Sequence, residues 1–328
     1  MKKSIPLFSW RFPAIILLFV GLLLSFGTHA QLALSFKDME TELGVEFGPS
    51  FFLGDLGGNL GNGKKFVKDL NFPSTRYFLG VSGTMRPASW LGIRGNINFG
   101  QLYGNDANTT GNDFASEGRR ERNLDFRTNI FETQLLFEFY PTDFLIPGDD
   151  LPRFRPYVVG GVGIFHFNPQ GSYTNSAGQT TWVDLRPLHT EGEGFAPDVQ
   201  DGQVYPAEYT LWQPNIPFGI GARYDLSDKL AISAEVLDRF TFTDYIDDVS
   251  GQFVQDTMQF YKYLPPTTAA LAIKMANKSG LPISAFSTRG DPNNNDTYFT
   301  FTVRLIFKFG EDSWYGRASS EVRCPVRW

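Results

Sequence analysis

The stretch LGIRGNINF, residues 91–99, alternates apolar residues with small or polar ones. Successive side chains of a β-strand point to opposite faces, so a period of two predicts a strand with one apolar face. The clarity of this alternation makes the stretch the reference for reading the rest of the chain. Its apolar positions are Leu91, Ile93, Ile97 and Phe99, and its other face carries Gly92, Arg94, Asn96 and Asn98.

Seven further segments have the same period, whereas only residues 267–277 (TTAALAIKMAN) show a weak helical pattern. The glycine-rich segment YVVGGVGIFHF leaves open which of its faces is apolar. Eight strands therefore dominate a chain of 328 residues that contains 33 glycines and 32 phenylalanines. Besides 91–99 the expected strands are 43–52, 77–85, 131–140, 157–167, 218–224, 230–242 and 298–309.

Alternating strands can build a soluble sandwich or a membrane barrel, and two features favour the barrel. Glycine on the polar face would weaken a sandwich strand without purpose, but it suits a crowded barrel interior. The connections after the first, third, fifth and seventh strands are long and the others are short, as in barrels with external loops and periplasmic turns. We predict an all-β fold, an eight-stranded antiparallel transmembrane β-barrel, with ten strands as the alternative if the connection after residue 242 hides a hairpin.

The first residues predict export to the bacterial envelope. Lys2, Lys3 and Arg11 precede the apolar run FPAIILLFVGLLLSF, which is followed by the small-residue stretch GTHA. This order is typical of a signal peptide, and fifteen residues are too few to span a bilayer as a helix. We expect a signal peptide at 1–30, the barrel at 31–309 and a periplasmic tail at 310–328, located in the cell outer membrane.

Charged residues on the polar faces should lie inside the barrel. Because an unpaired charge in a closed interior is costly, these residues should pair and form a plug that fixes the strand register. A narrow polar channel, and hence a small passive pore, is the alternative, although eight strands leave no open lumen. The expected interior charges are Arg76, Arg94, Arg223, Arg304, Lys308, Glu46, Glu132, Glu138 and Glu235.

The stretch TFTDYIDDVSGQF, residues 241–253, places Asp244, Asp247 and Asp248 beside Tyr245 at the outer end of the seventh strand. Three interpretations compete: carboxylates that cap turns, a calcium site, and a catalytic acid–base pair. The spacing does not match a twelve-residue calcium loop, and aspartate commonly caps turns by accepting backbone N–H bonds. We expect a structural loop, with no metal and no cofactor.

An outer-membrane enzyme acting on lipid or peptide is the alternative function. His166 and His189 are the histidines beyond the leader, and Ser172 follows His166. No nucleophile signature surrounds Ser172, so we expect His166 to belong to the aromatic girdle. The formal net charge of −6 and the lack of a basic run exclude nucleic acid as an expected partner.

Four motifs indicate a family: ELGVEFGPSFFLGDLGG at 42–58, VDLRPLHTEGEG at 183–194, PNIPFGIGARYDLS at 214–227 and FTFTDYIDDVSG at 240–251. Together they resemble the PorG-like outer-membrane β-barrels of Bacteroidota. The resemblance implies a non-enzymatic accessory component of the type IX secretion or gliding machinery, embedded in outer-membrane lipid. It also implies a periplasmic secretion-ring or lipoprotein partner.

The tail GEDSWYGRASSEVRCPVRW, residues 310–328, follows the aromatic residue that should close the last strand. Arginine and tryptophan are enriched in binding hot spots, so the tail either docks this partner or is a disordered terminus. Cys324 is the only cysteine, so any disulfide must be intermolecular. The docking candidates are Trp314, Tyr315, Arg317, Arg323, Cys324, Arg327 and Trp328.

Overall fold

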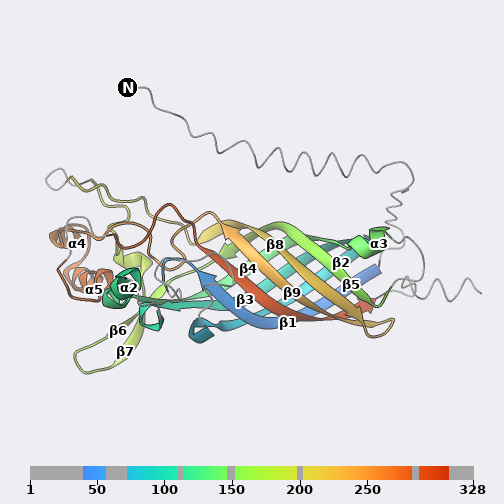
Figure 1. Ribbon diagram of the computed structural model, residues 1–328. Helices are drawn as coiled ribbons and strands as arrows, with labels where there is room; N and C mark the ends of the chain where they lie inside the picture. The colour runs from blue at the N-terminus through green and yellow to red at the C-terminus, as the bar shows by residue number, and fades with distance from the viewer. Residues whose placement is uncertain are drawn as a thin grey trace, which may run out of the picture. The chain divides into compact units, whose positions relative to one another are not determined.

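Eight long strands form a closed antiparallel barrel in the computed structural model, which describes residues 40–56, 72–109, 114–145, 152–197, 202–282 and 288–309. The ring closes because the first strand pairs with both the second and the last (Figure 1). The predicted fold class is confirmed; the predicted signal peptide and tail lie outside the described residues. The barrel strands are β1 (Glu40–Leu53), β2 (Arg76–Ala88), β3 (Leu91–Asn105), β4 (Asp125–Phe139), β5 (Phe154–His166), β8 (Trp212–Asp225), β9 (Leu230–Thr241) and β10 (Thr297–Phe309).

The remaining elements lie in the connections. The predicted helix is present as α5, and the described part of the 242–296 connection adds no barrel strand, so the ten-strand alternative is wrong. A short hairpin in the 167–211 connection instead joins the edge of β4 through one residue pair, Arg127 and Gln170. No helix in the described ranges is long and apolar enough to cross a membrane. These elements are β6 (Gln170–Thr174), β7 (Thr180–Asp184), α2 (Phe114–Arg122), α3 (Pro141–Leu145), α4 (Met258–Tyr263), α5 (Pro266–Ala276), and the 3-10 turns η2 (Phe72–Ser74), η3 (Asp106–Asn108) and η4 (Arg186–Leu188).

Several strands are longer than the sequence predicts, and the extensions of β3 and β4 shape the outer end of the barrel. The alternation is clear only to Phe99 and from Phe131, yet β3 and β4 stay paired as far as Asn105 and Asp125. Their paired extensions continue beyond the end of β5 at His166, so part of the sheet projects past the closed ring. The hairpin β6–β7 attaches to this projecting part.

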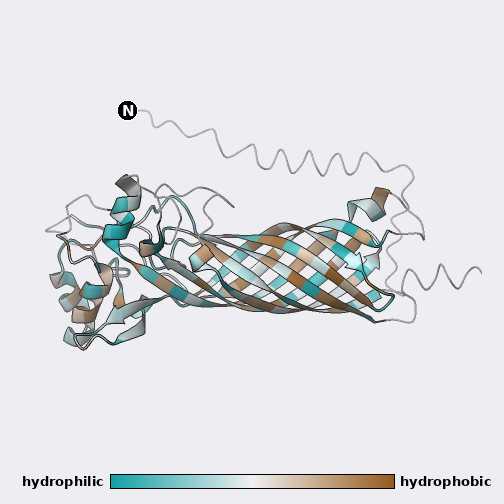
Figure 2. Ribbon diagram, turned by 60° about the horizontal axis from the view of Figure 1, so that its bottom comes forward, coloured by the Kyte–Doolittle hydropathy of each residue, from teal (hydrophilic) through white to brown (hydrophobic). Residues whose placement is uncertain are grey.

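The two faces of each barrel strand meet opposite environments. Ile97 is 46% exposed and Val81 54%, while the neighbouring Asn98 and Ser82 are buried. The strand with undecided facing, β5, directs Tyr157, Val159 and Phe165 inward. Figure 2 shows the resulting brown apolar positions along the barrel strands. A continuous apolar exterior over a polar interior is the surface that a membrane-spanning barrel presents to lipid.

Glycine on the inner face is required by close approach of neighbouring strands. A Cβ atom at Gly48 would lie 1.9 Å from the carbonyl oxygen of Phe301, and one at Gly161 would lie 2.0 Å from that of Leu135. Both distances are far inside van der Waals contact, so any side chain there would push two paired strands apart. The inward glycines therefore permit the tight curvature of a small barrel.

Ion pairs fill the middle of the barrel. Arg94 bonds Glu138 and Glu235, each at 2.8 Å, and Arg304 also bonds Glu138 at 2.8 Å. The Tyr157 hydroxyl donates to Glu235 at 2.8 Å. These side chains are buried, and removing one partner of such a pair costs several kcal/mol because the other charge stays buried. We call the buried ion pairs inside the barrel, these and those at its two ends, the interior network.

The interior network continues toward both ends. At the outer end Arg239 bonds Glu132 at 3.3 Å, and Glu132 also accepts the Tyr298 hydroxyl at 2.9 Å. At the other end Arg223 bonds Glu42 at 2.7 Å. Asp225 joins Arg155, Arg223 and Lys308 there. Asp225 is the last residue of β8 and faces inward, two residues after Arg223.

Arg76 lies outside the interior network. It is the first residue of β2 and is only half-buried. Its guanidinium donates to the carbonyls of Pro73 and Thr75 and stacks 3.9 Å from the centre of the Tyr103 ring. The prediction of an interior charge is therefore wrong here, because a strand's first residue lacks the flanking residues that fix its direction.

Ile97→Lys should lower the free energy of unfolding in a bilayer by about 2–4 kcal/mol, because it puts a charge on the lipid-facing side of β3. Ile97→Leu keeps the face apolar and serves as the control. Urea titration of the barrel in lipid vesicles, followed by its heat-modifiable mobility on gels, measures the difference. Equal unfolding midpoints for the two variants would show that Ile97 does not contact lipid.

Candidate functional site

The segment that carries Asp244, Tyr245, Asp247 and Asp248 lies in the outer cap, which we define as the described connections at the outer end of the barrel. The three aspartates are buried and Tyr245 is half-buried, with its ring stacked 4.7 Å from Tyr209. The segment follows β9 directly and is therefore held against the rim of the barrel. It contacts connections that are distant in sequence.

Asp247 caps its own turn and ties two connections together. One carboxylate oxygen accepts the N–H of Val249 at 3.0 Å, and the other accepts the N–H of Leu56 at 3.0 Å. Leu56 belongs to the connection after β1. The turn-capping prediction is confirmed for Asp247, and the second bond shows that this residue also fastens the first connection to the last.

Asp248 is the centre of a second set of bonds. Its backbone has φ of 64°, a left-handed conformation that few residues other than glycine adopt. Its carboxylate accepts the hydroxyls of Tyr209 at 2.6 Å and Thr190 at 2.5 Å, and Arg289 lies 3.7 Å away. The network of bonds around this one carboxylate explains how the strained backbone is held.

Glu191 and Arg289 complete this second set, and both were missed by sequence reasoning. Glu191 accepts the backbone N–H groups of Ser250 and Gly251, each at 2.9 Å, and forms an ion pair with Arg289 at 3.2 Å. Glu191 belongs to the motif RPLHTEGEG, but neither its spacing nor that of Arg289 relates it to Asp248. Only the folded cap brings the three residues together.

A third group of acids has no ion-pair partner among the described residues. It comprises Asp244, Asp247 and Asp296, next to Asp55. Asp296 accepts the N–H of Ile246 at 2.9 Å through one oxygen, while its other oxygen and both oxygens of Asp244 lack a hydrogen bond of ordinary geometry. In the described part of the chain, no three His, Cys, Asp or Glu side chains are arranged to hold a metal ion.

Burial raises the pKa values of these acids. Burial, opposed by the nearby Ser250 hydroxyl and reinforced by the charge of Asp55, raises the pKa of Asp244 to about 8. Burial and the neighbouring acids raise the pKa values of Asp247 and Asp296 well above their ordinary range. A carboxyl in such surroundings retains its proton at neutral pH. Burial therefore favours the protonated form of the acids in the third group.

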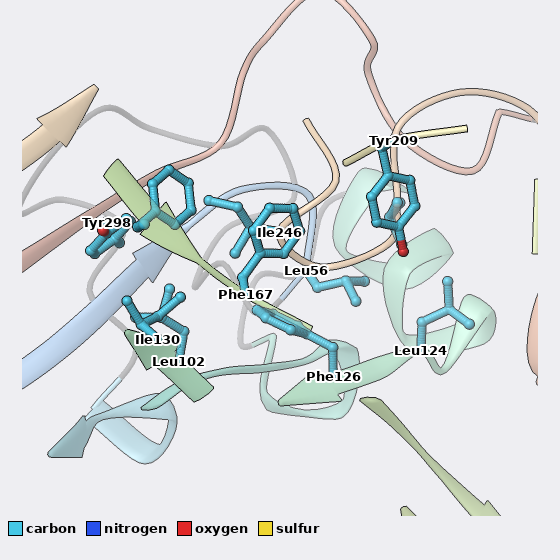
Figure 3. Close-up of a cluster of buried hydrophobic side chains, with 11 residues drawn as sticks. Leu56, Leu102, Leu124, Phe126, Ile130, Phe167, Tyr209, Ile246 and Tyr298 are labelled. Carbon is cyan, nitrogen blue, oxygen red and sulfur yellow. The ribbon is translucent and has the colours of Figure 1, made fainter. Parts of the chain in front are cut away.

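A hydrophobic cluster lies under these acids and seals the outer end of the barrel. Figure 3 shows Leu56, Phe126, Phe167, Ile246 and other buried residues converging from the connections and from the outer ends of the strands. Tyr298 links this cluster to the interior network through its hydroxyl bond to Glu132. Through these residues, the packing of the outer cap is continuous with that of the barrel interior.

The histidines show no catalytic arrangement. His166 ends β5, where its ring packs 5.0 Å from Trp212 in the outward aromatic girdle. Ser172 bonds Asp125 at 2.5 Å, and Asp125 forms an ion pair with Lys278. His189 bonds the backbone carbonyl of Glu193. No described bond joins a histidine to Ser172.

The remaining predicted site residues divide into two sets. Arg94, Arg223, Arg304, Lys308, Glu46, Glu132, Glu138 and Glu235 are all buried in the barrel. The docking candidates of the tail, residues 314–328, lie outside the described residues. Sequence reasoning missed the interior residues Glu42, Arg86, Arg155, Asp225 and Arg239, although the strand parity of Arg239 would have indicated it.

No protein-family model and no curated protein matches the sequence. Solved structures that resemble the chain at low scores include Ail, the attachment invasion locus protein of Yersinia pestis (TM-score 0.34, 8% identity, covering 83% of this chain and 99% of that one); Neisserial surface protein A (0.33, 7%, 83% and 97%); and a major outer membrane protein from Thermus thermophilus (0.36, 11%, 82% and 99%). The barrel assignment rests on the strand pairing described above.

The outer cap should lose stability as the pH rises from about 4 to about 8. In that window the unfolded aspartates ionise while Asp244 remains protonated in the folded cap, so the folded state binds more protons. The stability that protonated Asp244 contributes is complete below the pKa of an unfolded aspartate. It is lost as the pH rises past the pKa of Asp244 in the folded cap. Hydrogen exchange of residues 242–256, measured from pH 5 to 8, follows this change.

Asp244→Asn is the matched variant, because it keeps the shape and removes the titration. It should flatten the pH dependence of exchange relative to the unchanged chain. An identical slope in both proteins would contradict the assignment. A saturable protection by calcium that Asp244→Asn abolishes would show that a cation, and not a proton, neutralises the group.

Proposed function

We propose that this chain is a non-enzymatic outer-membrane β-barrel that acts as a closed anchor and presents a folded cap at the outer surface. The interior network is the observation that carries the proposal. Its arginines and carboxylates occupy the barrel from Asp225 at one end to Glu132 at the other. An eight-stranded barrel has room for little besides its own side chains, so such a network serves anchoring and not transport.

A passive pore needs a continuous water-filled path, and an enzyme needs a nucleophile aligned with a base. The filled interior argues against the first. For the second, Ser172 donates to the carboxylate of Asp125, which also holds the ammonium group of Lys278. An ammonium group held by a carboxylate is a poor general base. These arrangements favour a structural role over both alternatives.

We further propose that the barrel is an accessory component of a type IX secretion or gliding machine and docks a periplasmic partner. Support comes from the resemblance of the four sequence motifs to the PorG-like barrels. One of these motifs, FTFTDYIDDVSG, contains Asp247 and Asp248, whose side chains join separate connections of the outer cap. Residues 310–328, rich in arginine and aromatic side chains, are the proposed docking element.

The barrel should show no steady conductance in planar lipid bilayers. Single-channel recording of the purified protein checks this expectation, because water and ions cannot pass the buried pairs at Arg94 and Glu138. The double variant Arg94→Ala/Glu138→Ala removes both partners of one pair and should admit measurable current. Arg153→Ala, an exposed change away from the interior, is the control. Stable ohmic steps from the unchanged protein would overturn the closed-anchor proposal.

Deleting residues 311–328 should leave a heat-modifiable barrel that no longer co-purifies with its periplasmic partner. The physical reason is that the deletion removes arginine and tryptophan hot-spot residues but none of the barrel strands. Affinity purification from detergent-solubilised outer membrane, followed by mass spectrometry, identifies the proteins retained. If the truncated barrel retains the same proteins as the full chain, the tail is not the docking element.

A further inference from the structure

Four side chains form a stacked series on the outward face of the projecting sheet. The guanidinium of Arg76 lies 3.9 Å from the Tyr103 ring centre, and that of Arg127 lies 4.4 Å from the Trp182 ring centre. The two rings are 6.4 Å apart and meet edge to face. The members come from β2, β3, β4 and β7, and Trp182 reaches the others because the hairpin β6–β7 joins the edge of β4 (Figure 1). We call this series the arginine–aromatic ladder.

Neither arginine of the ladder has an acidic partner among the residues that the structure describes. No ion pair between described residues includes Arg76 or Arg127, in contrast to the arginines of the interior network. Arg76 donates to two backbone carbonyls, and Arg127 donates to the side chain of Gln170, which in turn donates to Asp184. A guanidinium stacked on a ring keeps N–H groups at its edge for an anion.

The height of the ladder above the apolar exterior matches the height at which a lipid headgroup would lie. Phe99 and Phe131 are paired across β3 and β4, with ring centres 4.9 Å apart, and mark the top of the apolar belt there. Tyr103 and Arg127 form the pair four residues further out. At about 3.3 Å per residue and a tilt near 40°, this pair lies about 10 Å above the aromatic rings.

A polar cavity of about 510 Å³ opens beside the ladder. Asp125, which lines it, lies two residues from Arg127 and on the same face of β4, so cavity and ladder are adjacent. Lys274 and Lys278 of the cavity come from α5 and the turn after it. Asp125 and Ser172 bond each other and Lys278, whereas Lys274 makes no ion pair with a described residue.

We propose that the ladder and the adjacent cavity bind the phosphorylated headgroup of an outer-leaflet glycolipid. Acyl chains would contact the apolar belt at Phe99 and Phe131, the phosphate groups of the headgroup would accept N–H bonds from Arg76 at one end of the ladder and from Arg127 at the other, and a sugar would enter the cavity. Arginine binds phosphate through two parallel N–H bonds, and 300–1,000 Å³ is the ordinary volume of a small-ligand site. The inference rests on the outer-membrane location given under the proposed function.

Native mass spectrometry of the full barrel, released from micelles that contain diphosphoryl lipid A, tests the proposal. The unchanged protein should retain lipid A, and Arg76→Gln/Arg127→Gln should bind it at least about tenfold more weakly, since charge-assisted bonds to phosphate are lost. Arg153→Gln removes one positive charge, as each ladder substitution does, from an exposed residue away from the ladder, and it should bind like the unchanged protein. Arg76→Gln alone, at a strand's first residue, covers the case in which the double variant does not fold.

Three results would overturn the proposal. If the ladder variants retain as much lipid A as Arg153→Gln, the ladder arginines do not take part in binding. If lipid A without phosphate groups is retained as well as diphosphoryl lipid A, the phosphate is not what the site recognises. Full competition by inorganic phosphate alone would reduce the site to a simple anion site. Failure of every protein to form a heat-modifiable barrel in lipid would instead contradict the proposed membrane location.

Discussion

The ion pairs of Arg94 with Glu138 and Glu235 are the constraint on which the rest of the barrel depends. Eight strands enclose a space that side chains fill, so a charge placed inside has no water to hydrate it. The register of a strand decides which residues are inside, and a slip of one residue would exchange Arg94 for Ile93. The same pairing therefore fixes the register, places the apolar residues on the outside and closes the lumen.

Unequal strand lengths explain why the outer end carries a folded cap. The neighbours of β3 and β4 end earlier, so the extensions of these two strands have free edges and uncovered faces. Exposed strand edges are filled in stable proteins, and here the hairpin β6–β7 takes the edge of β4. Leu102, Leu124 and Phe126 on the inner face of the extensions join the cluster that seals the barrel. The outward face of the same extensions is left to carry the arginine–aromatic ladder.

The sequence predicted the strand faces well because a strand has only two. Period two alone placed Glu132, Glu138, Glu235 and Arg304 inside, and burial confirms each. It could not predict which charges meet, since Glu42 of β1 and Arg223 of β8 pair across the interior and not between adjacent strands. The error lay at a strand end: Arg76 turns out of the barrel, because a terminal residue has no neighbour on one side to fix its direction.

The contacts around Asp247 and Asp248 in the outer cap could not be predicted from the sequence, for a different reason. Asp248, Thr190 and Arg289 come from three segments without periodicity, so no pattern relates them. Yet the chemistry of the buried acids differs from that of the barrel in one respect only. Glu138 has arginines on two sides, whereas Asp244 and Asp296 have no described ion-pair partner, and burial raises their pKa values. Burial thus acts in the barrel through opposite charges, and in the cap it acts both through the pair of Arg289 with Glu191 and through acids without a described cation, which makes these acids the part of the cap that responds to pH.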